Sequence, residues 1–223
     1  MSFPPINKDI SLFLGGHSVE EYIGHPFERI KKNTFTIAIN HSFCKLVPHA
    51  LVWQDYNVTK DLMLWVRSRK NKGHELPLLW SRHAAFLPKR EYGVDTENLN
   101  MLRGMYKEIP KDNRSGSYTA SLCINFLRKH YPSRKIYIFG LDMAGKDCWY
   151  DKYFEPLKRI KKCWDLTVHE TWPKDKTCSK PVKFVRKAKD DLNPWVNDTM
   201  IYNMNKQSNY KHFKYKNWEE ICQ

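Results

Sequence analysis

The segment Ile10–Ser18, with the sequence ISLFLGGHS, decides how the chain is expected to fold. Its apolar first half is typical of a strand buried on both faces of a sheet, and Gly15–Gly16 ends that strand. Ser18 follows at the position of a helix N-cap, with Glu20–Glu21 in the first turn of a helix that should run to about Lys31. The segment therefore predicts a strand joined to a helix by a tight glycine turn.

The alternation of strand and helix patterns continues along the chain. Further strand patterns lie at Thr34–Ile39, Ala50–Gln54, Leu76–Trp80, Lys135–Phe139 and Leu166–His169. Helical patterns lie between them, at Thr59–Arg69, from Arg114 to Lys129 and at Tyr153–Cys163. This alternation predicts an α/β fold with a mainly parallel sheet and helices on both faces. With 223 residues, 41% of them hydrophobic, the chain is long enough to bury its core as one large domain.

Positive charge is the strongest signal in the composition. The chain has 38 Lys and Arg against 24 Asp and Glu, which gives a formal net charge of +14. The excess is found in both halves and forms clusters at Arg67–Lys72, Arg128–Lys135, Lys158–Lys162 and Lys183–Lys189. A folded domain this basic favours a polyanionic partner such as nucleic acid, although a solubilising surface without a partner would have the same composition.

The apolar and cysteine patterns exclude several classes of protein. No apolar run approaches the roughly 18 residues of a membrane span, and the N-terminus lacks the pattern of a signal peptide, so we expect a cytoplasmic protein. The six cysteines include no C-x-x-C pair. His41, Cys44 and His49 are close in sequence, but no fourth ligand can be named. Reduced thiols and no metal site are therefore expected.

Polar residues follow several of the predicted strands, at the edge where parallel α/β folds bind ligands. They are found at Gly15–Ser18, Asn40, Gln54–Asp55 and Gly140–Asp142. The glycine turn would leave amide groups open at a helix N-terminus, which suits a phosphate. It would serve equally as a tight turn with a serine cap and no ligand. Asp142 could bind a ribose hydroxyl, an amide or a metal, or cap the next turn.

The segment Arg114–Ser117, RSGS, repeats this device at the start of a later helix and adds a guanidinium group. Two such junctions favour a nucleotide or a sugar phosphate more than either does alone. An N-cap beside a surface arginine is the alternative. The chain contains neither a P-loop nor a G-x-S-x-G nucleophile elbow.

Five segments together resemble a known family: LFLGGHS, TFTIAIN, ALVWQD, RSGSYTASL and KIYIFGLD. They are similar to the bacterial single-domain sialyltransferases that act on lipo-oligosaccharide, and to the wider superfamily that includes archaeal 6-hydroxymethylpterin pyrophosphokinase-like proteins. The resemblance covers about residues 9–172 and is carried best by SGSY and IYIFGLD. It implies a Rossmann-like fold that binds a nucleotide-sugar donor. We interpret residues 1–172 as that donor-binding domain and residues 173–223 as a basic C-terminal extension packed on it.

The resemblance also implies which residues surround the donor. They are Gly15, Gly16, Asn40, Gln54, Arg114, Ser115, Gly116 and Asp142, and we predict with them His17, Ser18 and Ser117 from the same two turns. Tyr150 falls at the spacing after Asp142 where the sialyltransferases place a tyrosine that steadies the leaving phosphate.

The chain departs from that family at important positions. The donor turn reads Gly-Gly-His-Ser, Gln54 replaces an asparagine, and the lid segment that carries the sialyltransferase histidine is missing. These departures argue against sialic acid as the sugar and leave the general base open. We predict Asp55 and His169 as catalytic residues together with Tyr150, with His17 and Asp147 as further candidates for the base.

The function expected from these patterns is a glycosyltransferase that uses a nucleotide sugar, and no metal is firmly implied. The charge suggests a polyanionic acceptor, and the specific hypothesis is modified, hydroxymethylated DNA of the kind that bacteriophages glycosylate in the host cytoplasm. One alternative is a non-catalytic nucleic-acid-binding protein on a degenerate transferase fold. Another is pyrophosphoryl transfer, which would require Mg²⁺ near Asp142 and Asp147.

Overall fold

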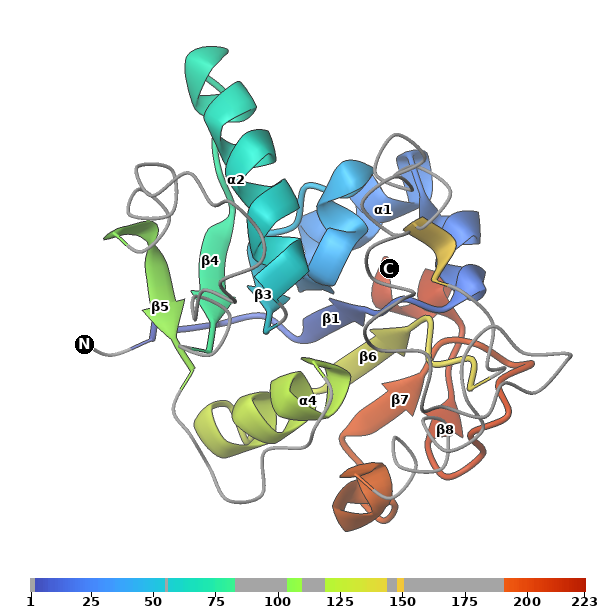
Figure 1. The fold of residues 1–223 in the computed structure, drawn as a ribbon. Coiled ribbons are helices and arrows are strands. Elements are labelled where there is room, and N and C mark those ends of the chain that lie inside the picture. The colour runs from blue at the N-terminus through green and yellow to red at the C-terminus, as the bar shows by residue number, and fades with distance from the viewer. Residues whose placement is uncertain (1–2, 55, 83–103, 110–118, 144–147, 151–190) are drawn as a thin grey trace, which may run out of the picture.

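The computed structural model describes residues 3–54, 56–82, 104–109, 119–143, 148–150 and 191–223. Within these residues the strands form one eight-stranded sheet in the order β5-β4-β3-β2-β1-β6-β7-β8, and every neighbouring pair is parallel (Figure 1). The strands are β1 (Ile10–Phe13), β2 (Phe35–Ile39), β3 (Ala50–Trp53), β4 (Leu78–Ser81), β5 (Tyr106–Glu108), β6 (Ile136–Phe139), β7 (Ile201–Asn203) and β8 (Lys214–Tyr215). The expected α/β fold with a parallel sheet is therefore confirmed.

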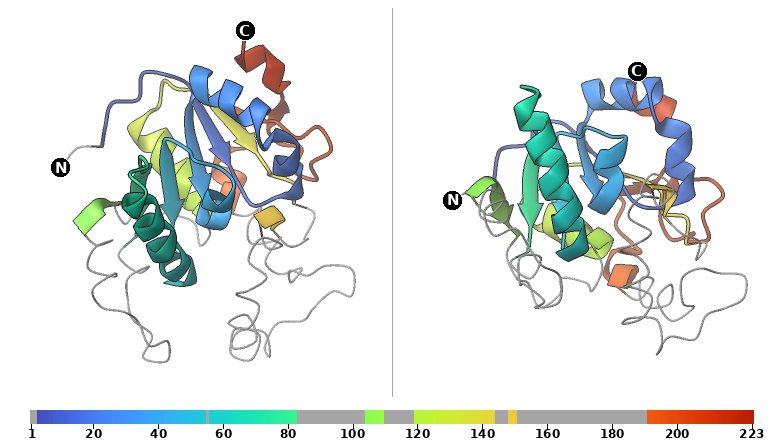
Figure 2. Two further views of the ribbon diagram at one scale, coloured as in Figure 1. Left: turned by 90° about the horizontal axis from the view of Figure 1, so that it is seen from above. Right: turned by 45° about the horizontal axis from the view of Figure 1, so that its top comes forward.

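Helices cover both faces of this sheet. Among the described residues the α-helices are α1 (His25–Asn33), α2 (Tyr56–Asn71) and α4 (Thr119–His130), and the 3-10 helices are η1 (His17–Tyr22), η2 (Asn40–Cys44), η5 (Asn193–Trp195) and η6 (Trp218–Ile221). The views in Figures 1 and 2 show α1 and α2 on one face and α4 on the other. None of the helices in the described part of the chain combines the length and the apolar character needed to span a bilayer.

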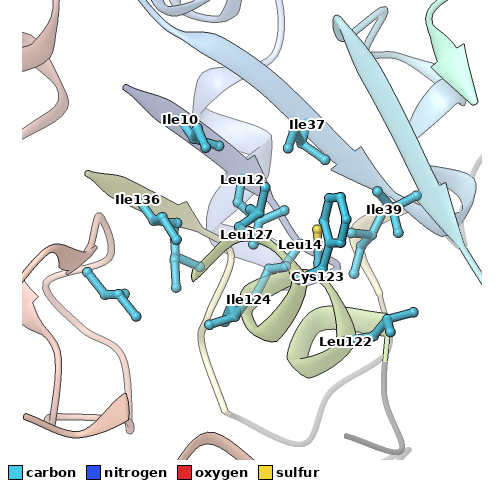
Figure 3. Packing of buried hydrophobic residues seen from close by; sticks show 14 of the residues in the cluster. Ile10, Leu12, Leu14, Ile37, Ile39, Leu122, Cys123, Ile124, Leu127 and Ile136 are labelled. Carbon is cyan, nitrogen blue, oxygen red and sulfur yellow. The ribbon is translucent and has the colours of Figure 1, made fainter. Parts of the chain in front are cut away.

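Two apolar cores result, because successive side chains of a strand point to opposite faces. On β1, Leu12 packs in the core on the α4 side, and Phe13 packs in the core beneath α1 and α2. Figure 3 shows the first of these cores, where isoleucines and leucines of three central strands converge on Leu122, Cys123, Ile124 and Leu127 of α4. The central strands are thus buried on both faces, which is why they are almost wholly apolar in sequence.

The helix expected from Ser18 to Lys31 is divided in two. The 3-10 helix η1 ends at Tyr22, and Gly24 then adopts a φ of +90°, a conformation that favours glycine. Pro26 occupies the first turn of α1, where its missing N–H leaves no intrahelical bond unmade. The expectation of one continuous helix was wrong because Gly24 and Pro26 interrupt it.

Residues 191–223 contribute to the same sheet. The strands β7 and β8 are only three and two residues long, which is too short for a recognisable strand pattern. The surrounding segment is also rich in lysine and asparagine, which are not typical strand residues. β7 pairs with β6 through the register Ile136 to Ile201. The helix expected at Tyr153–Cys163 and the strand expected at Leu166–His169 lie outside the described residues.

Basic residues gather where the helices end. Because a helix between parallel strands runs antiparallel to them, its C-terminus lies at the amino edge of the sheet. The last turns of the three α-helices carry Lys31, Lys32, Arg69, Lys70, Arg128, Lys129 and His130. Cations at these positions also complement the negative end of the helix dipole.

His49 lies at the same edge, just before β3, and its imidazole serves the fold. Its Nδ1 accepts a hydrogen bond of 3.0 Å from the Thr36 amide, and its ring stacks on Phe35 with 5.1 Å between centroids. Burial lowers the pKa of His49, and the nearby charges of Lys31 and Lys8 lower it further. His49 is thus a structural histidine, engaged with Thr36 while His41 pairs with a carboxylate on α2.

We expect the stability of the protein to decrease as the pH is lowered through 6.5, the ordinary pKa of histidine. The unfolded chain then binds a proton that the folded chain resists, so the free energy of unfolding falls. In a His49→Asn variant the amide oxygen can accept the Thr36 bond without titrating, and the fall should be smaller. The measurement is the urea midpoint at about pH 7.5 and about pH 5.5. Burial also lowers the pKa of His130, which affects both proteins alike, so an equal fall in both would contradict the assignment to His49.

Candidate functional site at the carboxyl edge of the sheet

The strand order reverses direction between β1 and β6. From β1 the chain builds outward through β2, β3, β4 and β5, and it then returns to place β6 on the other side of β1. In open parallel sheets, ligands bind beyond the carboxyl ends of the strands at such a reversal. The loops that follow β1 and β6 are therefore the first place to look for a site.

These two loops approach each other too closely for a side chain between them. The Gly16 amide donates a hydrogen bond of 3.1 Å to the Gly140 carbonyl, and Gly140 has a φ of +80°. A Cβ atom added to Gly16 would lie 2.3 Å from that carbonyl oxygen and 2.6 Å from Cγ of Asp142. Glycine at position 16 is thus required by the contact between the loops.

Asp142 joins three loops through its carboxylate. Oδ2 accepts a hydrogen bond of 2.9 Å from the Ser18 amide, and Oδ1 accepts one of 2.5 Å from the Ser18 hydroxyl. Asn205, just after β7, donates its side-chain N–H to the same Oδ1 at 2.8 Å. The loops after β1, β6 and β7 are therefore held by one carboxylate, which we call the Asp142 junction.

The junction changes the expected roles of Ser18 and Asp142. Ser18 was expected to be a helix N-cap, but it lies within η1, where its amide and hydroxyl both donate to Asp142. The amides expected to be open for a phosphate also have partners within the chain: Gly16 donates to Gly140, and Val19 donates to Gly16. Asp142 was expected to face the donor, whereas the hydrogen bonds described for its carboxylate connect the three loops to one another.

The segment Cys148–Tyr150 returns to the end of β1. The Trp149 amide donates to the Gly15 carbonyl at 3.0 Å, and its indole N–H donates to the Leu14 carbonyl at 3.1 Å. A Cβ atom on Gly15 would lie 2.8 Å from Sγ of Cys148 and 3.2 Å from the Tyr150 hydroxyl. Two residues predicted for the site, Gly15 and Tyr150, are thus neighbours in space.

A histidine and an aspartate form a pair at the end of the adjacent strand. Nε2 of His41, the second residue of η2, lies 2.6 Å from Oδ2 of Asp61 on α2. The His41 ring also lies 5.7 Å from the Tyr150 ring, measured between centroids. Asn40 precedes this histidine with a φ of +50° and accepts a hydrogen bond of 3.2 Å from the Thr119 hydroxyl.

Backbone strain is found at the same edge. Among the described residues, the non-glycine positions with positive φ are Asn40 and Met143, which follow β2 and β6. Residues held in this region cost free energy and tend to occur at functional sites. Their position agrees with a site at the carboxyl edge.

The remaining predicted residues are divided between this edge and parts of the chain outside the described residues. Gln54 follows β3, two strands from β1, and is half-buried. His17 follows the glycine turn, but its exposed ring lies against Glu20 at 3.1 Å. The predicted residues outside the described part of the chain are Asp55, Arg114, Ser115, Gly116, Ser117, Asp147 and His169. Within the described part, no three His, Cys, Asp or Glu side chains gather as a metal site would require.

Sequence reasoning missed three residues of this edge: His41, Asp61 and Asn205. His41 was considered only as a metal ligand, although it directly follows a predicted site residue at a strand end. Asp61 lies in the middle of a helix, where its partner depends on how that helix packs. Asn205 follows a strand that the sequence did not reveal.

Comparison with known proteins shows the fold. No protein-family model matches the chain, and no curated protein matches its sequence. The chain is similar in structure to the sialyltransferase CstII from Campylobacter jejuni in complex with the substrate analogue CMP-3FNeuAc. The two chains are 12% identical with a TM-score of 0.51, and the match covers 93% of this chain and 86% of that chain. A second similar structure is the monofunctional alpha-2,3-sialyltransferase Cst-I from the same organism, with 12% identity, 96% and 84% coverage and a TM-score of 0.49. The likeness to CstII supports the α/β Rossmann-like fold.

We expect a Gly16→Ala variant to be less stable than the wild-type protein by roughly 1–3 kcal/mol, the usual cost of forcing a methyl group into a closed space. The added methyl group would meet backbone and a hydrogen-bonded carboxylate, neither of which can move without opening the Asp142 junction. Gly104→Ala is the control, because in the described part of the chain no atom beyond the neighbours of Gly104 lies within 4 Å of its Cβ position. Urea unfolding of the two variants checks the expectation, and equal midpoints would contradict the close contact.

Proposed function

We propose that the protein is a glycosyltransferase that moves a sugar from a nucleotide-sugar donor bound at the carboxyl edge of β1 and β6. The observation that carries the proposal is the meeting of Gly15, Tyr150 and the Asp142 junction at the point where the strand order reverses. The similarity of the fold to a sialyltransferase structure with a CMP-sugar analogue supports a donor of this class.

The proposed reaction is a direct displacement at the anomeric carbon. The acceptor oxygen forms a bond to that carbon while the bond from the carbon to the phosphate oxygen breaks, and the electron pair leaves with the phosphate. Arg114 and Tyr150 are proposed to stabilise the charge on the departing phosphate, and Ser115, Gly116 and Ser117, which precede α4 in the sequence, are proposed to bind it. Asp55 and His169, which lie outside the described residues, stay proposed as catalytic residues.

Within this proposal the donor-binding residues have two roles. Gly15, Asn40 and Gln54 are proposed to line the donor, because each follows a strand at the carboxyl edge. Gly16, Ser18 and Asp142 are proposed to act by holding the loops in position, since their polar groups are engaged with one another or with Gly140 and Asn205. His17 is proposed to contact the donor from the exposed side of the same turn.

For the acceptor we propose DNA, modified in the manner of hydroxymethylated phage DNA, in the cytoplasm of the host. The net charge of +14 supports this choice, as do the cations at the amino edge of the sheet. These cations are separated from the carboxyl edge by the length of a strand, roughly 15 Å. A polymer can reach across that distance, so one DNA molecule could contact both edges.

Two alternatives make different predictions. A non-catalytic nucleic-acid-binding protein on this fold would bind DNA and leave nucleotide sugars intact. A pyrophosphoryl transferase would require Mg²⁺ and a triphosphate, and it would leave sugar donors intact as well. Release of free nucleotide from a nucleotide sugar therefore distinguishes the proposed function from both.

The donor site is tested by thermal shift against CMP, UDP, GDP, ADP and their sugar conjugates. A ligand at about 100 times its dissociation constant should add about 2.7 kcal/mol to the free energy of unfolding. Arg114→Ala should weaken binding of that ligand by roughly 1.5–3 kcal/mol, typical of a hydrogen bond to a charged group. Arg134→Ala, at the amino edge, removes the same charge and should bind as the wild type does. If no nucleotide in the panel shifts the transition, the proposed donor site is wrong.

The DNA acceptor is tested by the salt dependence of binding to duplex DNA, measured by fluorescence anisotropy. About five phosphate contacts would give a slope of log K against log salt near −4 to −5. Reversing the charges of the exposed Arg67, Lys70 and Lys72 should flatten that slope by roughly 2.7. Arg69 is left unchanged because its guanidinium donates to the Glu75 carbonyl and stacks on Trp65.

The matched control exchanges these three residues without loss of charge, as Arg67→Lys, Lys70→Arg and Lys72→Arg. Because the slope counts charges, the control should keep the wild-type slope. Nucleotide binding should be the same in all three proteins, since the substituted residues lie at the far end of α2 from the carboxyl edge. Absence of DNA binding by the wild type at about 50 mM salt would exclude this acceptor.

A further inference from the structure

The pair formed by His41 and Asp61 differs from an ordinary surface ion pair. Its 2.6 Å contact is short, and the side chains are only 19% and 14% exposed. Exposed pairs of this kind contribute little, because water screens them. Here both partners are largely withdrawn from water, so the contact fixes the orientation of the imidazole.

The pair is assembled from separate elements that are each anchored. Asn40 turns the chain from β2 into η2, and the Thr119 hydroxyl at the start of α4 holds its side chain at 3.2 Å. Asp61 is contributed by α2, whose Leu62 and Val58 are buried in the core beneath that helix. The imidazole therefore has a fixed place at the carboxyl edge, next to the residues proposed to line the donor.

The contact also determines which nitrogen can act as a base. An ionised carboxylate only accepts hydrogen bonds, so Nε2 of His41 carries the hydrogen that Asp61 accepts. In the neutral imidazole the lone pair then belongs to Nδ1. When Nδ1 takes up a proton, the carboxylate of Asp61 stabilises the resulting imidazolium, as an aspartate does for the histidine of a hydrolytic triad.

The neighbour of this imidazole is the tyrosine proposed for the leaving phosphate. The His41 and Tyr150 rings are 5.7 Å apart, and the Tyr150 hydroxyl reaches the end of β1 beside Gly15. Asp61 on α2 and Tyr150 are thus titratable groups that face His41 from different elements. Tyr150 lies beside Gly15 at the end of β1, and His41 follows β2, which is the strand next to β1.

We propose that His41 is the general base of the reaction and that Asp61 is the positioning residue that orients it. This inference rests on the proposed glycosyltransferase function. As the acceptor oxygen bonds to the anomeric carbon, its proton passes to Nδ1 of His41, and the electron pair of the breaking bond leaves with the phosphate. Water takes the place of the acceptor when none is present, so that the donor is hydrolysed by the same route.

The experiment measures nucleotide release from CMP-N-acetylneuraminate, UDP-glucose, UDP-galactose and GDP-mannose between about pH 5 and pH 9. The wild-type rate should fall at low pH, because a base that already holds a proton cannot accept one from the acceptor. His41→Gln should lower kcat by about 10²–10⁴-fold and abolish that acid limb, because general base catalysis contributes this much. Nucleotide affinity should stay within about twofold of the wild type, since glutamine keeps a donor for Asp61.

Two further variants separate catalysis from folding. Asp61→Asn should lower kcat and leave nucleotide affinity unchanged, because the imidazolium formed during the proton transfer loses its carboxylate. Asp198→Asn is the matched control: it disrupts the ion pair with Arg128, which has the same 2.6 Å length and similar exposure of 12% and 13%, but belongs to the amino edge. It should leave the rate and the pH profile unchanged. If His41→Gln does not fold, His41→Ala replaces it, and added imidazole should restore part of its activity.

The outcomes distinguish this inference from the proposed function. A His41→Gln variant that keeps the acid limb and a rate within tenfold of the wild type would overturn the role of His41 and leave the donor site standing. Nucleotide binding without hydrolysis of any of the four donors would also overturn it, because no reaction would need the base. If no nucleotide binds at all, the proposed function itself is wrong.

Discussion

The carboxylate of Asp142 is the constraint on which the geometry of the carboxyl edge depends. It accepts hydrogen bonds from the amide and hydroxyl of Ser18 and from the side chain of Asn205, so it unites the ends of three strands that lie far apart in sequence. A buried or half-buried carboxylate requires such partners, because leaving it unsatisfied costs more than the bonds themselves contribute. Removing Asp142 would therefore release several donors at once and loosen every loop that they position.

The sheet separates two kinds of chemistry at its two edges. The carboxyl edge holds the His41–Asp61 pair and the two positive-φ residues Asn40 and Met143. The amino edge collects the cations of the helix ends. Both follow from the direction of the strands. Parallel strands place all their carboxyl ends at one edge of the sheet, and the helices that return between them place their own carboxyl ends at the opposite edge. The direction of the strands thus places the candidate site at one edge and the basic side chains at the other.

The sequence was sufficient to predict the fold class and most central strands, because strands buried on both faces are continuous apolar runs. The patterns at Ile10–Leu14 and Lys135–Phe139 each match an observed strand to within a residue. The short strands β7 and β8 carry no such pattern, and their place in the sheet follows from pairing with β6. The site was predictable only where a residue follows a recognisable strand, as Asn40 does. His41 and Asp61 became partners through the packing of α2, which no local pattern encodes.

The central pairing of β1 with β6 also has a consequence for how the molecule folds. Ser18 and Asp142 are separated by 124 residues, and the Lys135 amide reaches the Asp9 side chain across 126 residues. The entropy of closing so long a loop must be overcome before these contacts contribute any stability, and folds dominated by such distant pairings form slowly. On the ribosome, β1 through β5 emerge well before β6, so one side of β1 stays unpaired until β6 has been synthesised. Completion of the carboxyl edge is therefore a late event, and the nascent chain assembles the Asp142 junction only after the second half of the sheet has docked.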